Sequence, residues 1–457
     1  MAPLAAMLKA RGHDVQGSDH AMYPPMSDYL VREAIVTFDG YRPEQITPEV
    51  DVVVVGNAIS RGNAELEEVL DRKIRFVSLP ELVRDQFLWS ARSIVVAGTH
   101  GKTTTTALTG WLLTAAGLDP SVLVGGIALD FDGSFRLGAG RDFVIEGDEY
   151  DSAFFDKTAK FLKYLPDIAV VGNLEYDHAD IYPDMESLRM AFRRLLALVP
   201  RRGLVIIGAD SAEAARLASF ARSRVVTFGT EAEADWRVAA VNASDGAVTF
   251  DVTRRGEPYG RFESHLHGTH NVRNALAALI VGDAVGLSAG QMAKGLSSFR
   301  GVRRRMELRG VRRGVSVFDD FAHHPTAILE TLRGARWSNP DRRLWAIFEP
   351  RSATSSRRVF QDDFARAFID SGADEVILPD VFRASLPPDE RLSIETLVKA
   401  VNAGGRRARH IPAVPDIVRT VAEEARPGDV VVIMSNGGFD GIHDRLLAAL
   451  EGPQSFP

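Results

Sequence analysis

Cysteine is absent from the 457 residues of the chain. Its absence excludes disulfide bonds, thiolate metal ligands and cysteine nucleophiles, so any metal ion must be held by oxygen or imidazole ligands. An excess of positive charge is also lacking, because 54 Lys and Arg residues face 61 Asp and Glu residues, which gives a formal net charge of −7. A mildly acidic chain is a poor candidate for a general nucleic-acid-binding protein. We therefore expect no nucleic-acid partner.

Long apolar runs are missing as well. The longest, such as Val52–Val55 and Val430–Met434, are far shorter than the roughly 18 residues that a membrane-spanning helix requires. No signal peptide opens the chain, and the composition is that of an average soluble protein. The sequence therefore predicts a cytoplasmic protein without a membrane partner, and its length favours about three domains.

The first block of the chain, residues 1–90, alternates helical and strand patterns. Ala2–Lys9 is apolar at helical spacing, and His13–Gly17, Asp51–Gly56 and Arg75–Val77 are typical of short buried strands. Such an alternation predicts a doubly wound α/β domain.

The order of the elements in this block is unusual at its start. A Rossmann-type domain opens with a strand, a glycine-rich loop and a helix, followed by a strand and an acidic residue. Here the helix comes first and Asp19 is the acidic residue. We expect roughly 20 further residues upstream of Met1 that end in a strand and a glycine loop. The alternative is a domain that begins with the helix itself.

The second and third blocks, residues 91–299 and 300–457, continue the α/β alternation. The second block also contains residues 235–263, whose alternating pattern around an Asp245-Gly246 turn predicts a small antiparallel addition. The expected strands of the two blocks are Ser93–Ala97, Phe143–Ile145, Ile168–Val171, Leu204–Ile207, Arg224–Phe228, Val315–Phe318, Trp345–Phe348, Glu375–Leu378 and Val430–Met434.

A glycine-rich loop follows the expected strand Ser93–Ala97 and precedes an expected helix, Thr103–Ala116. Glycines let backbone N–H groups approach phosphate oxygens, and the N-terminus of a helix adds partial positive charge. Lys102 is placed to reach the phosphates and the Thr103 hydroxyl to hold Mg²⁺. Only two residues separate Gly98 from Gly101, so the loop is a variant of the common phosphate-binding pattern. The alternative is a structural turn without a ligand.

Two further strand ends carry residues suited to a magnesium ion. Phe143–Ile145 is followed by an acidic cluster that contains Glu146 and Glu149, and Ile168–Val171 is followed at a short distance by His178. Mg²⁺ prefers oxygen ligands, and sites in α/β sheets lie at the carboxyl ends of strands. We therefore expect one shared cleft, against the alternatives of a solvated acidic loop and a structural histidine.

Six motifs in order along the chain resemble the Mur ligase family: GTHGKTTTT, IEGDEYD, GNLEYDHADIYPD, GTHNVRNALAAL, GVRRRMELRG and FDDFAHHPTAI. The resemblance covers nearly the whole chain. It implies an α/β fold with three domains: a Rossmann-like UDP-sugar-binding domain over residues 1–90, a central P-loop ATP-binding domain over 91–299, and a Rossmann-like C-terminal domain for the substrate or peptide over 300–457.

The resemblance also implies an activity. Two branches of the family share the double histidine His323-His324; one adds L-alanine to UDP-N-acetylmuramate, and the other adds the recycled tripeptide L-Ala-γ-D-Glu-meso-diaminopimelate. The segments Asp148–Asp151, Leu174–Ile181, Phe348–Ser352 and Ser435–His443 are similar to the tripeptide-adding branch. The implied enzyme is an ATP- and Mg²⁺-dependent ligase of peptidoglycan recycling that forms a C–N bond through an acyl phosphate.

Three other functions stay open at this point. They are the alanine-adding ligase of peptidoglycan synthesis, a P-loop ATPase or switch that does not ligate, and a remnant that binds substrates without catalysis. The expected partners are UDP-N-acetylmuramate and the tripeptide, and a monomer is favoured.

The resemblance assigns roles to individual residues. The expected catalytic residues are Lys102, Glu146 and His178, and the expected metal ligands are Thr103, Glu146 and His178, with Glu149 as a weaker choice. The expected ATP-binding residues are Gly98, Thr99, His100, Gly101, Lys102, Thr103, Thr104, His270, Asn271, Asn274, Arg305, Asp320 and His324. UDP-sugar binding is expected of Ser18, Asp19, Asn57 and Ser60, and peptide binding of Arg351, Ser352 and Asn436.

One position departs from much of the family. Several members use a carbamylated lysine as a metal ligand, and the nearest residue in this chain is Arg193, which stays cationic and cannot take that role. The two branches with the double histidine resemble this chain in lacking the lysine, so we still expect an active enzyme.

Overall fold

The computed structural model describes residues 1–20, 22, 26–178, 181–244, 247–352, 354–382 and 386–451. The chain divides into two compact units. The first comprises Met1–Leu174, Glu186–Phe228 and Ala277–Gly295, and the second comprises Glu175–Met185, Gly229–Leu276 and Leu296–Pro457. Across the described residues, no helix combines the length and apolar character that crossing a membrane requires.

The N-terminal part of the first unit contains short strands and helices. They are α1 (Ala2–Ala10), β1 (Gln16–Asp19), α2 (Met26–Arg32), β2 (Val36–Asp39), β3 (Val53–Val55), α3 (Ala64–Asp71), β4 (Phe76–Ser78) and α4 (Leu79–Val83). In the described part of the chain, β1 pairs in parallel with β2, and β3 pairs in parallel with β4, as two two-stranded sheets.

The expected helix at Ala2–Lys9 is confirmed as α1, but the expected strand at His13–Gly17 is wrong. The strand begins at Gln16, because Gln16 is the first residue that pairs with β2, opposite Val36. His13 lies before the strand and is exposed. The expected strand therefore starts three residues too early.

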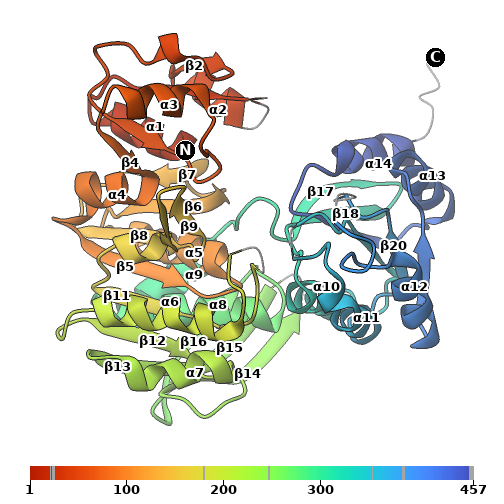
Figure 1. Cartoon of the computed structure of the whole chain (residues 1–457). Coiled ribbons are helices and arrows are strands. Elements are labelled where there is room, and N and C mark those ends of the chain that lie inside the picture. Colours follow the sequence, from red (N-terminus) through yellow and green to blue (C-terminus); the bar gives the residue numbers. More distant parts are fainter. Residues whose placement is uncertain are drawn as a thin grey trace, which may run out of the picture. The chain divides into compact units, whose positions relative to one another are not determined.

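The main sheet of the first unit runs in the order β13-β12-β11-β5-β8-β6-β7 (Figure 1). Its strands are β5 (Arg92–Ala97), β6 (Ser121–Ala128), β7 (Gly133–Arg136), β8 (Asp142–Gly147), β11 (Ile168–Val171), β12 (Leu204–Gly208) and β13 (Arg224–Gly229). All neighbours are parallel except the edge pair β6–β7. Val/Ile-rich strands of this kind are buried on both faces, as the continuous apolar runs predict.

The register of this sheet brings three strand ends together. Ala97 at the end of β5 lies opposite Val171 at the end of β11 on one side and Gly147 at the end of β8 on the other. Residues that follow these three strands therefore share one edge of the sheet. The helices of the central region are α5 (Lys102–Ala115), α6 (Met185–Leu198), α7 (Ala212–Arg216), α8 (Thr269–Ala284) and α9 (Ala289–Ser298), and β9 (Asp151–Ala153) and β10 (Asp156–Ala159) form a small antiparallel pair.

The second unit contains an antiparallel meander, as the sequence predicts for residues 235–263. Its strands are β14 (Trp236–Ser244), β15 (Ala247–Arg254) and β16 (Glu257–Ser264), which pair in sequence. The expected Asp245-Gly246 turn lies outside the described residues.

The C-terminal part of the second unit is a six-stranded sheet in the order β17-β18-β22-β19-β20-β21. Its strands are β17 (Glu307–Arg312), β18 (Val315–Asp320), β19 (Leu344–Phe348), β20 (Glu375–Leu378), β21 (Arg407–His410) and β22 (Val430–Met434). Its helices are α10 (Pro325–Ser338), α11 (Gln361–Asp370), α12 (Ile394–Ala403), α13 (Val414–Glu424) and α14 (Ile442–Glu451).

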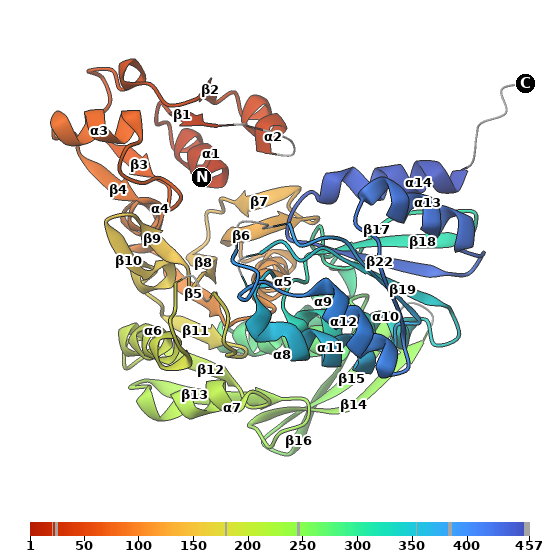
Figure 2. The same cartoon turned by 45° about the vertical axis from the view of Figure 1, so that its right-hand side comes forward.

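Both faces of this sheet are covered by helices (Figure 2). α10, α11 and α12 pack on one face against alternate strand residues such as Ala346 and Phe348, and α13 and α14 pack on the other against Trp345 and Ile347. Alternation along β19 therefore divides one strand between two apolar cores. This is the Rossmann-like arrangement that the resemblance implies for residues 300–457.

Candidate active site

The phosphate loop connects β5 to α5 at the shared edge of the first unit's sheet. Gly98 has a φ of +131°, and a Cβ atom there would lie 3.0 Å from the carbonyl oxygen of Asn173. Gly101, the residue before α5, adopts the left-handed conformation with φ 80°. Both positions therefore require glycine, and the absence of side chains there lets an anion approach the loop backbone closely.

Asn173 holds this loop in shape. Its side-chain oxygen accepts a hydrogen bond from the His100 backbone N–H at 2.8 Å, and its side-chain nitrogen donates to the His100 carbonyl at 3.1 Å. Its carbonyl accepts from the Thr99 N–H at 3.2 Å. The sequence analysis did not single out Asn173; the available signal was its position just after β11, the strand that neighbours β5.

Lys102 lies folded back onto the loop. Its Nζ donates to the carbonyls of Gly98 and Thr99 at 2.7 and 3.1 Å and to Glu149 at 2.9 Å. Burial by itself favours the neutral amine, but the neighbouring carboxylates, led by Glu149, outweigh it and raise the pKa of Lys102. The residue therefore stays cationic in a largely buried position, as a phosphate-binding lysine must.

Thr103 and Glu146 come together from α5 and β8. The Thr103 hydroxyl donates to Glu146 Oε1 at 3.0 Å, and the Gly125 backbone N–H donates to Glu146 Oε2 at 2.7 Å. A Cβ at Gly125 would lie 2.9 Å from that same carboxylate oxygen, so a larger residue there would displace the Glu146 carboxylate. The sequence analysis missed Gly125 because nothing in the chain's local pattern links β6 to β8.

The acidic cluster after β8 divides into two ion pairs. Glu149 contacts Lys102, and Asp148 accepts a hydrogen bond from Lys160 Nζ at 2.6 Å. Burial opposes ionisation of Asp148, yet Lys160 and Lys102 lower its pKa below the ordinary value. Glu149, the weaker metal candidate, is thus the counter-ion of the phosphate-loop lysine in this structure.

These residues fit a magnesium nucleotide. The set combines the glycine-containing backbone at the start of α5, a buried ammonium group, a hydroxyl and a carboxylate, which are the groups that phosphates and Mg²⁺ prefer. Lys102 and the loop would hold phosphate oxygens, and Thr103 and Glu146 would hold the cation. Thr104, the remaining residue expected here, is buried within α5.

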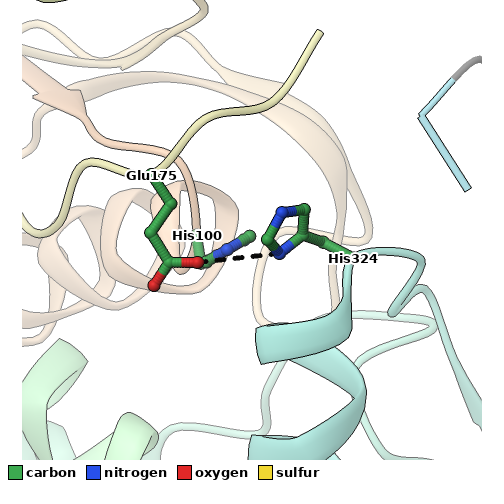
Figure 3. Close-up of side chains that lie close together, drawn as sticks. All are labelled: His100, Glu175 and His324. Carbon is green, nitrogen blue, oxygen red and sulfur yellow. Dashed lines mark ion pairs between the residues drawn. The ribbon is translucent and has the colours of Figure 1, made fainter. Parts of the chain in front are cut away.

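In the second unit, the segment after β11 binds to the start of α10. Glu175 Oε2 accepts a hydrogen bond from Thr326 Oγ1 at 2.6 Å and lies 3.6 Å from His324 Nδ1, the ion pair marked in Figure 3. Asp177 accepts a hydrogen bond from Thr354 at 2.6 Å. Burial raises the pKa of Asp177, but the nearby histidines and this hydrogen bond hold it well below its ordinary value.

His178 has a left-handed backbone, with φ 57°. Its carbonyl accepts hydrogen bonds from the Ile181 and Tyr182 N–H groups, both at 2.9 Å, so two hydrogen bonds fix this carbonyl. It belongs to the second unit, whereas Thr103 and Glu146 belong to the first. Its expected place beside those two ligands stays a prediction.

Three of the residues expected to bind ATP, namely His270, Asn271 and Asn274, lie in the first turns of α8. Asn274 Nδ2 donates to Asn271 Oδ1 at 3.1 Å, and Asn271 Nδ2 donates to the His267 carbonyl at 2.8 Å. His270 Nδ1 lies 3.7 Å from Glu330, but burial and the nearby guanidinium groups of Arg273 and Arg305 lower the pKa of His270 to about 3. His270 is therefore neutral at physiological pH.

Asp320 ends β18 with its carboxylate turned toward the backbone. It accepts hydrogen bonds from the Met306 and Ala322 N–H groups, both at 2.8 Å, and from Thr331 at 3.2 Å. Burial raises its pKa, and Arg305 acts against that rise. His324 caps α10 through its Nδ1, which accepts from the Thr326 N–H at 3.4 Å.

The expected peptide-binding residues lie after β19 and β22. The Arg351 guanidinium lies 3.7 Å from the centre of the Phe382 ring and 3.6 Å from Glu349, and Ser352 donates to Ser355 at 2.8 Å. Among the described residues, the buried side-chain oxygen of Asn436 has no hydrogen-bond partner.

The expected UDP-sugar residues lie at the end of β1 and after β3. Ser18 donates to Glu65 at 2.7 Å, and Asp19 accepts from the Tyr41 hydroxyl at 2.9 Å. Asn57 and Ser60 are exposed on the loop that follows β3. Each of these four residues lies at or near the carboxyl end of a strand, where α/β domains bind ligands.

Arg193, the residue in place of a lysine, has a structural role. It donates to Glu186 at 2.9 Å, and its guanidinium lies 4.2 Å from the centre of the Phe220 ring.

Comparison with known proteins identifies the family. Residues 1–87 match the Mur ligase family catalytic domain, 96–282 the Mur ligase middle domain, and 304–437 the Mur ligase glutamate ligase domain. The chain belongs to the Mur ligase family and is an ATP-dependent ligase of that family.

Named relatives span the whole chain. The UDP-N-acetylmuramate–L-alanyl-γ-D-glutamyl-meso-2,6-diaminoheptandioate ligase of Escherichia coli is 38% identical over 452 residues, 98% of this chain and 96% of that protein. The UDP-N-acetylmuramate–L-alanine ligase of Salinibacter ruber is 37% identical over 457 residues, 99% of this chain and 93% of that protein. The crystal structure of a murein peptide ligase from Psychrobacter arcticus has a TM-score of 0.73 at 36% identity, covering 99% of this chain and 97% of that one.

Proposed function

We propose that the chain joins the tripeptide L-Ala-γ-D-Glu-meso-diaminopimelate to UDP-N-acetylmuramate with hydrolysis of ATP to ADP and phosphate. The observation that carries the proposal is the full-length similarity, 38% over 98% of the chain, to a ligase of E. coli whose name specifies that peptide. The tripeptide is a fragment of peptidoglycan, so the reaction returns a breakdown product to synthesis.

The proposed chemistry has two steps. A carboxylate oxygen of the muramoyl group attacks the terminal phosphorus of ATP, the bond to the bridging oxygen breaks, and ADP leaves. The amino group of the peptide's alanine then attacks the resulting acyl phosphate and loses a proton, and inorganic phosphate leaves as the amide forms. Phosphoryl transfer of this kind depends mostly on positioning and on neutralising charge.

The chain's own residues supply both requirements. Lys102, kept cationic by Glu149, would stabilise the charge on the transferring phosphoryl group. Thr103 and Glu146 would hold Mg²⁺, which neutralises phosphate charge when bound, and His178 would contribute on the side of the acyl phosphate. Asn271, Asn274, His270, Arg305, Asp320 and His324 would bind ATP from the second unit.

Substrate binding is assigned to the two ends of the chain. Ser18, Asp19, Asn57 and Ser60 would bind the UDP-sugar, and Arg351, Ser352 and Asn436 would bind the peptide. The buried side-chain oxygen of Asn436, which has no partner among the described residues, is suited to accept a hydrogen bond from a peptide N–H.

A second function has a specific observation in its favour. The alanine ligase of S. ruber is 37% identical over 99% of the chain, nearly the same identity as the tripeptide ligase of E. coli. The two activities share the ATP and UDP-sugar requirements and differ only in the amine that attacks.

One assay separates these functions. The protein is incubated with ATP, Mg²⁺ and UDP-N-acetylmuramate, with either the tripeptide or L-alanine, and release of ADP is measured. We expect ADP only when the tripeptide and the UDP-sugar are both present. Release of ADP with L-alanine and the UDP-sugar, but not with the tripeptide, would identify the alanine-adding function. Release without either co-substrate would identify an ATPase, and no release under any condition would identify a binding protein.

A further inference from the structure

The second unit contains a cavity of about 320 Å³, and of its lining residues only His324 has been given a role above. Its walls are the residues just after Leu174, the start of α10, and the face of α11. Glu175 and His324, whose side chains are drawn in Figure 3 with the carboxylate 3.6 Å from Nδ1, form one wall, and Asp363, Arg366 and Asp370 of α11 form the other.

The charges around this cavity are mixed but mainly negative. Three carboxylates, those of Glu175, Asp363 and Asp370, face one guanidinium group, that of Arg366. Arg366 contacts Asp363 one helical turn earlier, and the two side chains are 70% and 44% exposed. An ion pair this exposed contributes little to stability, so neither group is committed to holding the fold.

The remaining wall is apolar. Phe360 is buried and its ring lies 5.4 Å from the ring of His324, in an edge-to-face arrangement. The cavity therefore combines an apolar base with an outer rim that has one cation and an excess of anions. Such a rim suits a ligand that ends in both a carboxylate and an ammonium group, joined to an aliphatic stem.

The cavity is connected to the expected peptide site through one short segment. Ser352 accepts a hydrogen bond from the Ser356 N–H at its carbonyl, Thr354 accepts one from the Arg357 N–H, and the chain then reaches Phe360. Phe360 lines the cavity, so the expected peptide residue Ser352 is joined to the cavity wall by eight positions of chain held by these hydrogen bonds.

We propose that this cavity binds the distal amino-acid centre of the peptide's diaminopimelate residue. Arg366 pairs with the distal carboxylate, Asp363 and Asp370 pair with the distal ammonium group, and the aliphatic stem lies against Phe360. The inference rests on the proposed function and adds to it the residues that determine the specificity for the third residue of the peptide. A peptide with lysine in that position retains the ammonium group but has no carboxylate for Arg366.

The test compares kcat/KM for two peptides, L-Ala-γ-D-Glu-meso-diaminopimelate and L-Ala-γ-D-Glu-L-Lys, in the full-length protein. The substitution Arg366→Gln is expected to lower kcat/KM about tenfold or more for the first peptide and less than about twofold for the second, because only the first loses a charge-assisted pair. The substitution Asp363→Asn is expected to lower kcat/KM for both peptides, since both have the ammonium group.

Arg419→Gln is the matched control. Arg419 pairs with Asp416 on α13 with the same spacing, and its side chain is 65% exposed. It lies outside the cavity and should leave both values unchanged. Thermal unfolding of each variant checks that the fold is retained.

An unchanged ratio between the two peptides in Arg366→Gln, or the same change in Arg419→Gln, would overturn the inference. A wild-type protein that ligates neither peptide would instead refute the proposed function itself, so the two failures differ in the wild-type measurement.

Discussion

Lys102 and His270 are both basic residues in the first turn of a helix, and both are largely buried, yet they carry different charges. Lys102 begins α5 and keeps its proton, because Glu149 lies 2.8 Å away and raises its pKa. His270, the second residue of α8, loses its proton, because burial and two guanidinium groups lower its pKa to about 3, although the Glu330 carboxylate lies 3.7 Å from its Nδ1.

The N-terminus of a helix favours anions, so a cation there needs a close counter-charge. The comparison teaches that burial alone does not decide the charge of such a residue. In the first unit, the cation of Lys102 lies where the phosphates of ATP are expected. In the second unit, His270 is a neutral imidazole among the other residues expected to bind ATP.

The largest effect is expected from removing the cation itself. Lys102→Ala should lower kcat for ligation by more than about a thousandfold, because stabilisation of the transferring phosphoryl group is worth several kcal/mol. ADP release under saturating substrates measures this loss. Lys399→Ala, which removes a lysine that pairs with Glu395 on the surface of α12, is the control and should leave kcat unchanged. Retained turnover in Lys102→Ala would contradict the phosphate role.

Removing only the counter-charge sharpens the comparison. Glu149→Gln should lower the free energy of unfolding by about 3 kcal/mol, because it leaves the Lys102 ammonium buried without its carboxylate. Chemical denaturation measures this change.

A double substitution tests whether the two residues act as a pair. Lys102→Met in the Glu149→Gln background should be less destabilising than the two single changes added together. Strict additivity would show that Glu149 does not act as the counter-ion of Lys102.

Because His270 is neutral in the folded protein, the free energy of unfolding depends on pH. A base whose folded pKa lies below its ordinary value of about 6.5 binds fewer protons in the folded than in the unfolded state, so stability is lost as pH falls below 6.5. Between pH 7 and pH 5 the wild-type protein should lose about 2 kcal/mol that His270→Gln does not lose. Denaturation at both pH values measures the difference. His13→Gln, at an exposed position before β1, should keep the wild-type slope; an equal slope in His270→Gln would contradict a neutral His270.

The smallest effect is expected from Asn173, an uncharged residue that holds the phosphate loop by hydrogen bonds. Asn173→Ala removes two hydrogen bonds to His100 and should raise the KM for ATP about tenfold, with about 1 kcal/mol lost from stability. Asn402→Ala is the matched control, because Asn402 also holds backbone groups, those of Val398 and Ala408, but in the second unit. It should lower stability and leave the KM for ATP unchanged, whereas a parallel change in both variants would remove the case for a loop-specific role.

Much of the fold could be predicted from the sequence because buried parallel strands are continuous apolar runs. Ile168–Val171, Glu375–Leu378 and Val430–Met434 have the bounds that the sequence predicted. The mostly exposed strands β1 and β17 lack that signal, and the first was misplaced while the second was not anticipated. A strand with exposed residues is defined by the partner it pairs with, which local composition does not reveal.

Of the candidate site, the sequence by itself determined the chemical inventory: a glycine loop between a strand and a helix, Lys102 and Thr103 at the start of that helix, and Glu146 at the end of another strand. Local rules suffice there, because loop, helix start and strand end are all short-range patterns. Only the tertiary structure decided which groups meet. Glu149 pairs with Lys102 across 47 positions of the sequence, and Asn173 holds the phosphate loop by hydrogen bonds to His100 across 73 positions. The Gly125 N–H donates to Glu146 across 21 positions. These contacts follow from the order of strands in the sheet, β11-β5-β8-β6, and strand order is set by long-range pairing that no local pattern encodes.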